Sequence, residues 1–317
     1  MNKQNYQLKI LQLTDLHWSQ DFLINKNSKK MISRIAMNFR PDLIVITGDL
    51  LHDVCFKNPI AAIDDIIRTF DELRIPWTFV FGNHEREYKD FSISDLAKYI
   101  TKNSKYVLFN DFRINDRVGN YRLVIPTKKA YVNLFFLDSG GHEIYEDKPS
   151  YSWITPEQIS WVDKEINQIK NKNDKDSIYL FFQHIPVPEY KDLIDKKVAG
   201  DKNEEVSSPI YNSGFYKFLK EKLPNNKKFM FVGHDHYNDY IINDDDFVLC
   251  YGRQTGFYKY DPSLTTEQQI NGHEHNEKKY TDNYLRGARF FEIKSDFILI
   301  GRIFEEYKKI TDYTNYL

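Results

Sequence analysis

The sequence predicts a layered α/β fold, and three observations support this prediction. Short apolar or β-branched runs recur between residues 8 and 240 and have the length of buried strands. Amphipathic helical patterns lie between several of these runs. Beyond residue 240, further strand patterns follow one another with little helix between them. Because strands that alternate with helices are typical of sheets covered by helices, we expect a layered α/β architecture.

The predicted strands are short and apolar. Leu8 to Leu13 alternates apolar and polar residues, which is typical of a strand with one buried face. The other runs are almost entirely apolar, which indicates strands buried on both faces. They are Leu43 to Ile46, Trp77 to Phe81, Val132 to Leu137, Ile178 to Phe182 and Phe229 to Val232.

Three helices are predicted between these strands. Lys29 to Phe39 has helical spacing and ends before Pro41. Ile60 to Leu73 places its large apolar residues on one face. Pro156 to Ile169 starts directly after Thr155, a residue type that caps helix N-termini well.

The C-terminal part predicts a second, more antiparallel sheet. It contains three strand patterns joined by loops, which are Phe247 to Tyr251, Ala288 to Ile293 and Phe297 to Ile303. The chain has no internal repeat and no linker that separates two domains. We therefore expect a single domain over residues 1 to 317, with its core motifs in residues 8 to 240 and with residues 241 to 317 completing the second sheet.

Composition excludes several classes of protein. The 44 basic and 46 acidic residues leave a net charge of -2, so no overall field attracts nucleic acid or an anionic membrane. No apolar stretch has the length of a membrane span, and Leu8 to Leu13 is too polar for a signal peptide. Cys55 and Cys250 are in no paired cysteine motif. A reducing, cytoplasmic location is therefore expected.

Polar side chains follow five of the predicted strands, at the point where each strand ends. The five groups are Asp15 and His17, Asp49, Asn83 and His84, His184, and His234 and His236. Taken singly, each group has a simpler role as a helix cap, a turn or a hydrogen-bonded core residue. Ligand sites of open α/β sheets collect at the carboxyl ends of strands, so the shared placement favours one common site.

The residue types in these groups predict a two-metal centre. The candidate ligands are Asp15, His17, Asp49, Asn83, His184, His234 and His236. Imidazole, carboxylate and amide ligands without thiolate suit Mn, Fe or Zn. Seven ligands are too many for one ion, so we expect two divalent ions that share a bridging carboxylate, with Asp49 as the bridge. Such a centre can hold a phosphate ester across both ions and activate a bound water.

Four further residues have predicted roles near the metals. His84 lies next to a candidate ligand, so it can reach the substrate without binding a metal and can act as the catalytic acid. Glu85 or Asp235 could orient a histidine through its second ring nitrogen. Arg253 is a candidate substrate-binding cation. The remaining histidines lie in polar surroundings without matching partners and are left out of the centre; they are His52, His142, His273 and His275.

The five groups, in this order, resemble the motif pattern of calcineurin-like metallophosphoesterases. The resemblance spans residues 8 to 240 and implies a four-layered αββα sandwich of two mixed sheets flanked by helices. It also implies how the metals are shared. One metal would bind Asp15, His17, Asp49 and His236, and the other Asp49, Asn83, His184 and His234. His84 matches the catalytic histidine of the family.

Two segments are similar to the branch related to purple acid phosphatases, namely Gly233 to Asp239 and Gly252 to Gly256. The coloured enzymes of that branch have a tyrosine ligand three residues after the bridging aspartate, and this chain has His52 there. We therefore expect Mn, Fe(II) or Zn and no purple colour. Whether His52 contacts a metal is left open.

The predicted function is hydrolysis of a phosphate ester by a hydroxide bound to the two metals. A phosphomonoester on a small molecule or a phosphoprotein is the leading substrate. A phosphodiester, such as a cyclic nucleotide or a glycerophosphodiester, is the alternative, because the same ligands serve both reactions. Specificity is expected from the loops Ile185 to Ser213 and Gly252 to Lys279. A non-catalytic metal-binding protein is the third possibility, and the complete ligand set argues against it.

Overall fold

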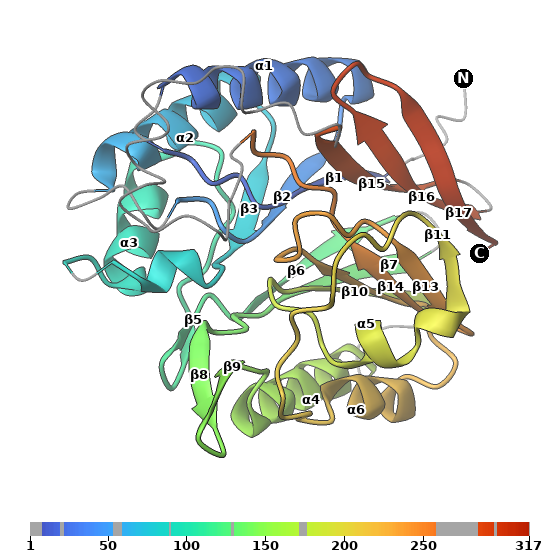
Figure 1. The fold of residues 1–317 in the computed structure, drawn as a ribbon. Coiled ribbons are helices and arrows are strands. Elements are labelled where there is room, and N and C mark those ends of the chain that lie inside the picture. Colours follow the sequence, from blue (N-terminus) through green and yellow to red (C-terminus); the bar gives the residue numbers. More distant parts are fainter. Residues whose placement is uncertain are drawn as a thin grey trace.

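A computed structural model describes residues 8–19, 22–52, 59–88, 90–127, 130–170, 176–257, 285–294 and 297–316. In this part of the chain two large mixed sheets face each other and helices cover their outer faces (Figure 1). This arrangement confirms the predicted αββα sandwich. None of the described helices has the length and apolar character needed to cross a lipid bilayer.

The first sheet has six strands in the order β17-β16-β15-β1-β2-β3. Its strands are β1 (Leu8–Leu13), β2 (Leu43–Thr47), β3 (Trp77–Val80), β15 (Gly287–Ile293), β16 (Phe297–Phe304) and β17 (Lys309–Tyr316). β1, β2 and β3 run parallel, and β15 pairs antiparallel with β1. The carboxyl ends of the three parallel strands therefore lie at the same edge of the sheet.

The second sheet has seven strands in the order β11-β13-β14-β12-β10-β7-β6. Its strands are β6 (Tyr121–Pro126), β7 (Ala130–Phe136), β10 (Asp176–Phe182), β11 (Lys197–Ala199), β12 (Lys228–Val232), β13 (Ile241–Asp244) and β14 (Phe247–Tyr251). β7, β10, β12 and β14 are parallel. Two small ribbons lie outside the large sheets, and they are formed by β4 (Arg113–Ile114) with β5 (Arg117–Val118) and by β8 (His142–Tyr145) with β9 (Lys148–Tyr151).

The helices lie on the outer faces of the two sheets (Figure 1). They are α1 (Phe22–Phe39), α2 (Ile60–Leu73), α3 (Ile93–Asn103), α4 (Pro156–Lys170), α5 (Glu189–Asp192) and α6 (Phe215–Lys222), with 3₁₀ turns at His84–Arg86 and Ile194–Lys196. α4 begins as predicted, because Thr155 and Gln158 exchange side-chain and backbone hydrogen bonds. α1 begins earlier than the predicted Lys29. The apolar pattern does not reveal its first turns, because polar Asn25 and Ser28 occupy buried positions there.

Three apolar clusters correspond to the spaces between the four layers. The middle one lies between the sheets and includes Val45 of β2, Leu180 of β10 and Phe291 of β15. A second packs α1, α2 and α3 onto the first sheet. The third packs α4 and α6 onto the second sheet. Burial of both sheet faces explains why most strands have continuous apolar runs.

The prediction that residues 241 to 317 complete the second sheet is wrong for the last three strands. β13 and β14 join the second sheet, whereas β15, β16 and β17 extend the first. The physical reason lies in β1, whose residues are almost all buried. Without β15, β1 would be an edge strand with unpaired backbone groups in the protein interior.

Candidate metal centre

The loops that follow the parallel strands meet where the two sheets approach each other. Asp15 and His17 follow β1, and their backbone N–H groups donate to the carbonyls of Gly48 and Asp49 in the loop after β2. The second sheet contributes from its own side, because the Gly233 N–H donates to the His184 carbonyl. Backbone hydrogen bonds thus join neighbouring loops and fix the side chains they carry.

The backbone of this region is strained at the predicted ligands. Asp15, His17, Asp49 and His234 have φ angles of 51°, 44°, 49° and 80°, in the left-handed region that residues with a Cβ rarely adopt. Each such residue costs on the order of 1–3 kcal/mol and persists only where its surroundings impose the conformation. Strain of this kind gathers at functional sites, and here it falls on four of the seven candidate ligands.

Two glycines allow the loops to pack this closely. A Cβ on Gly82 would overlap the Asp49 carboxylate, and a Cβ on Gly48 would overlap the His184 ring. Gly48 also has a φ angle of +90°. Both glycines therefore have a geometric role in the centre.

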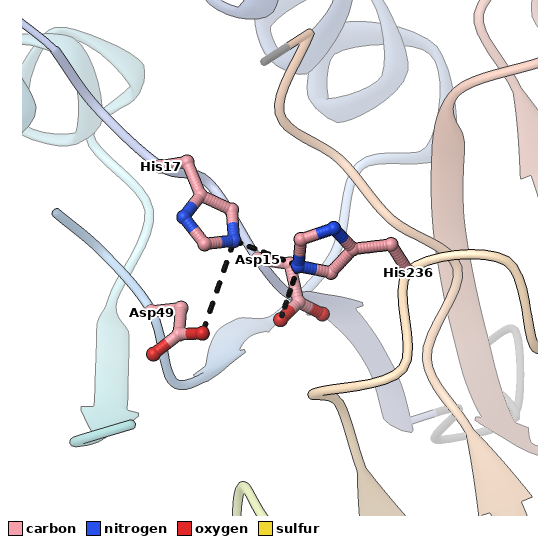
Figure 2. A group of neighbouring side chains, drawn as sticks. All are labelled: Asp15, His17, Asp49 and His236. Atoms are coloured by element: carbon pink, nitrogen blue, oxygen red, sulfur yellow. Dashed lines mark hydrogen bonds and ion pairs between the residues drawn. The ribbon is translucent and has the colours of Figure 1, made fainter. Parts of the chain in front are cut away.

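One group of four donors comes from both sheets (Figure 2). Asp15, His17, Asp49 and His236 each offer a ligand atom, and these atoms all lie within 4.8 Å of one another. His17 Nε2 is 2.9 Å from His236 Nε2 and 3.8 Å from Asp49 Oδ2. His236 Nε2 is 3.9 Å from Asp15 Oδ1. This is the set that the family resemblance implies for one metal.

A second group shares Asp49 with the first. Asp49, His184 and His234 also offer atoms within 4.8 Å of one another. His184 Nδ1 donates to the Thr47 carbonyl at 2.8 Å, so Nε2 is the ring nitrogen that faces the centre. That nitrogen faces Asp49 Oδ2 and Asn83 Oδ1, each at 3.1 Å. Ligand atoms that converge in this way fit a bound metal ion.

The pKa values of the two carboxylates in the centre, Asp15 and Asp49, shift in opposite directions. Burial raises the pKa of Asp15 to about 7, and the Asp49 charge adds to this effect. Burial acts the same way on Asp49, yet nearby His184 outweighs it and lowers the pKa of Asp49 well below its ordinary value. A cation bound in the centre would favour the charged state of Asp15.

The imidazoles are mostly held neutral. Burial lowers the pKa of His236 to about 3 and holds the pKa values of His17 and His234 well below the ordinary one. Burial also opposes a charge on His184, but Asp49 outweighs it and raises the pKa of His184 to about 9. A proton on His184 would occupy the place between acceptors that a metal ion can take.

A cavity of about 260 Å³ adjoins both groups. It is lined by Asp49, Asn83, His84, Glu87, His142, Tyr151, Glu204, Ser207, His234, Asp235 and His236. His84 belongs to neither donor group, and its Nε2 lies 3.8 Å from Asp49 Oδ2. A larger hollow of about 800 Å³, lined by Phe112 and Trp161 among others, contains none of the candidate ligands.

Glu85 and Asp235 do not orient a histidine through the contacts described for them. Glu85 accepts hydrogen bonds from the Leu51 and Gly82 N–H groups at 2.8 and 2.7 Å. Asp235 accepts from the Tyr251 hydroxyl and the Ser207 N–H. Both carboxylates accept hydrogen bonds that help to hold the loops that carry the ligands.

The predicted substrate-binding role of Arg253 is wrong. Its side chain is buried, pairs with Asp239, donates to the Leu285 carbonyl at 2.6 Å and lies over the Phe304 ring. It does not line the cavity beside the donor groups. A guanidinium that is already neutralised in the interior cannot serve as a free anion receptor.

Sequence reasoning missed several residues of the cavity, above all Glu87 and His142. Glu87 accepts from His84 Nδ1 at 3.0 Å and from His142 Nε2 at 3.3 Å. The missed signal was a sixth polar group after a strand, since Gly140, Gly141 and His142 follow β7. His52 is buried beside the centre, with its ring 5.6 Å from that of His17, and it belongs to neither donor group. His273 and His275 lie outside the described residues.

Comparison with known proteins gives a consistent result. Residues 8–238 match the family model described as "Calcineurin-like phosphoesterase". The chain is 29% identical over 293 residues to "Probable inactive purple acid phosphatase 29" of Arabidopsis thaliana, covering 81% of this chain and 74% of that protein. It is 28% identical over 282 residues to "Phosphatase DCR2" of Saccharomyces cerevisiae, covering 77% of this chain and 47% of that protein. Among solved structures, a dimetal phosphatase from Danio rerio has the same fold, with a TM-score of 0.61, 13% identity and coverage of 96% and 98%.

Proposed function

Because this chain belongs to the calcineurin-like phosphoesterase family, in the branch related to purple acid phosphatases, we propose that its preferred substrates are phosphomonoesters. Metal-dependent hydrolysis of phosphate esters follows from the family and from the candidate donor groups. The size of the cavity carries the finer proposal. At about 260 Å³ it is smaller than most ligand pockets, which suits a phosphoryl group with one substituent leading outward.

The donor atoms favour two divalent ions with Asp49 between them. Asp15, His17 and His236 complete one site, and the other site is completed by Asn83, His184 and His234. When bound, two such ions neutralise charge on phosphoryl oxygens and lower the pKa of a water toward neutrality. Nitrogen and oxygen donors without thiolate suit Mn, Fe(II) or Zn. We expect no purple colour, because His52 stands where the coloured enzymes have tyrosine.

His84 is assigned the proton transfer to the leaving oxygen. Its backbone N–H donates to Asp49 Oδ1 at 3.2 Å, which fixes the residue beside the proposed bridge. Its Nε2 is the ring nitrogen nearer to Asp49, at 3.8 Å, and its side chain lines the cavity. An ester oxygen that leaves from this cavity therefore departs toward a group that can protonate it.

A plant relative of this chain is named inactive, which raises the non-catalytic alternative. This chain retains all seven candidate ligands and His84, and two donor groups assemble around Asp49. The cavity beside them leaves space for a ligand. These observations support turnover in this chain.

A paired assay tests the proposal. The protein is loaded with Mn, Fe(II) or Zn and assayed with 4-nitrophenyl phosphate and bis(4-nitrophenyl) phosphate. We expect kcat/KM for the monoester to exceed that for the diester by about tenfold or more. A preference for the diester would make the protein a phosphodiesterase. Hydrolysis of neither ester by protein with full metal content would favour the non-catalytic alternative.

A further inference from the structure

We propose that Glu87 is the positioning residue of His84 and that His142, on the β8–β9 hairpin, holds Glu87 in place. The proposal rests on the proposed function, because it assigns a partner to the histidine that donates a proton to the leaving oxygen. It adds Glu87 and His142 to the residues that serve the reaction. Neither residue belongs to a candidate metal-binding group or to the five sequence groups.

Both oxygens of Glu87 face a histidine. Oε2 lies 3.0 Å from His84 Nδ1, and Oε1 lies 3.3 Å from His142 Nε2. An ionised carboxylate can only accept, so each ring must direct an N–H group toward it. His84 therefore carries a proton on Nδ1, and the proton that it gives to the leaving oxygen is a second one on Nε2, the nitrogen on the side of Asp49, 3.8 Å from Oδ2.

Ring packing does not decide which nitrogen of His84 faces the cavity. The ring lies edge-on to His17, with centroids 5.2 Å apart, and nearly parallel to His52, with centroids 6.4 Å apart. These contacts set the plane of the ring, but a half-turn about the bond to the ring preserves that plane. After such a turn a ring carbon would face Glu87, so the hydrogen bond to Glu87 selects the productive orientation.

The 3₁₀ turn His84–Arg86 is itself held from several sides. Glu85 accepts from two loop N–H groups, and Arg86 pairs with buried Asp138, just after β7. The base of the hairpin packs closely against the same turn. A Cβ added to Gly141 would lie 3.0 Å from Arg86 Cδ. The position of Glu87 is therefore fixed by the turn on one side and by His142 on the other.

The hairpin is anchored on the side opposite His142. Tyr145 packs on Trp153 and Tyr211, with ring centroids 5.9 and 5.4 Å apart. His142 packs on Tyr151, which lines the cavity. Burial opposes the charge on Glu87, but the hydrogen bonds from His142 and His84 outweigh it and lower the pKa of Glu87 to about 2. Glu87 thus remains an acceptor for both rings.

The first test compares two esters in metal-loaded variants. Glu87→Ala and His142→Ala should lower kcat for an alkyl phosphate, with Glu87→Ala costing about tenfold to a hundredfold, while KM and metal content stay unchanged. Hydrolysis of 4-nitrophenyl phosphate, whose leaving group needs no proton, should change by less than about twofold. Glu143→Gln on the same hairpin is the matched control, because Glu143 is exposed and its carboxylate accepts from the Ile144 N–H. Thermal unfolding of each variant reports any loss of folding.

A double-mutant cycle then shows whether Glu87 acts through His84. In a His84→Ala background, Glu87→Ala should cause no further loss of kcat. Additive losses, equal losses for both esters, or loss of metal would overturn the proposal. If the wild-type protein hydrolyses neither ester, the proposed function fails instead.

Positioning can also be measured without turnover. In zinc-loaded protein with ¹⁵N-labelled histidine, we expect Nδ1 of His84 to keep its proton whether or not Nε2 is protonated, and the neutral ring to be a mixture of the two tautomers in Glu87→Ala. The Glu87→Gln variant, which keeps one acceptor oxygen, should lie between these two. An unchanged His84 spectrum in Glu87→Ala would overturn the positioning role regardless of the enzyme's activity.

Discussion

Two of the buried polar clusters among the described residues differ in how their charges are balanced. One is the metal centre described above. The other, the arginine cluster, consists of Asp239, Arg253, Arg289, Arg302 and Asp312, and it joins β15, β16 and β17 to the segment after β12. In the arginine cluster each carboxylate pairs with guanidinium groups. In the metal centre, carboxylates and neutral imidazoles face one another.

Two aspartates show the difference. Asp15 and Asp239 are both fully buried. Burial raises the pKa of Asp15 to about 7, because the centre contains no fixed cation strong enough to oppose it. Burial acts on Asp239 as well, but Arg289, Arg253 and Arg302 outweigh it and lower its pKa below the ordinary value.

The contrast separates a structural cluster from a functional one. The arginine cluster contains its own counter-charges and connects parts of the fold. The metal centre combines converging ligand atoms with left-handed backbone at Asp15, His17 and Asp49. A bound ion can offset the cost of both features. Because the two clusters share no residue, a mutation in one should leave the other unchanged.

The largest effect is expected from Asp49→Asn, since Asp49 is the donor common to both groups. The variant should lose at least one metal ion per chain, and hydrolysis should fall by more than about a hundredfold. Asp312→Asn in the arginine cluster is the control and should keep both ions. Elemental analysis measures this directly. Two full ions in Asp49→Asn would remove the bridging role.

The next largest effect is expected from His84→Ala, which leaves both donor groups intact. We expect near wild-type metal content and a loss of kcat of about 10²- to 10⁴-fold for an alkyl phosphate. The loss should be much smaller for an activated aryl phosphate. Steady-state kinetics with both esters tests this, and equal losses would return His84 to a structural role.

Arg302→Met should act on stability and leave the metal centre unchanged. Arg302 pairs with Asp239 at 2.9 Å and with Asp312 at 3.0 Å, so its removal leaves two buried carboxylates under-compensated. We expect a loss on the order of 3 kcal/mol in the free energy of unfolding. Denaturant unfolding measures the loss, while the metal content per folded chain should stay the same. Loss of metal without loss of stability would contradict the separation of the two clusters.

The smallest effect is expected on anion inhibition in Arg253→Gln. Phosphate and vanadate should compete with substrate at the metals, because bound ions are the largest local charges in such a centre. The inhibition constants in Arg253→Gln should therefore stay within about twofold of wild type. An increase of tenfold or more, or inhibitor binding that survives chelation, would restore Arg253 as an anion-binding residue.

The sequence predicts those parts of the molecule whose signals are local. The candidate ligands could be found because each follows an apolar strand within a few residues, as His184 follows β10. The β8–β9 hairpin could not, because Lys148, Pro149 and Ser150 show no apolar alternation. α3 was missed although Ser92 and Asp95 form a capping box, a local signal that could have been used.

The division of the C-terminal strands depends on distant pairing. β15 lies beside β1, with Leu8 opposite Ile293. No local pattern in either strand specifies that partner. The same holds for Arg253, whose burial against Asp239 and Phe304 depends on strands that come together only in the folded chain. Burial and pairing between remote segments therefore decided the roles that the sequence predicted wrongly.

The metal content of the purified chain, measured together with its activity, tests the central claim most directly. Elemental analysis should find two divalent ions per chain, and a chelator should remove both the ions and the hydrolysis of 4-nitrophenyl phosphate. Re-addition of Mn, Fe(II) or Zn should restore activity, which is the result expected if the converging acceptors hold two cations. Full activity with a single ion per chain, or hydrolysis that persists after chelation, would contradict the account.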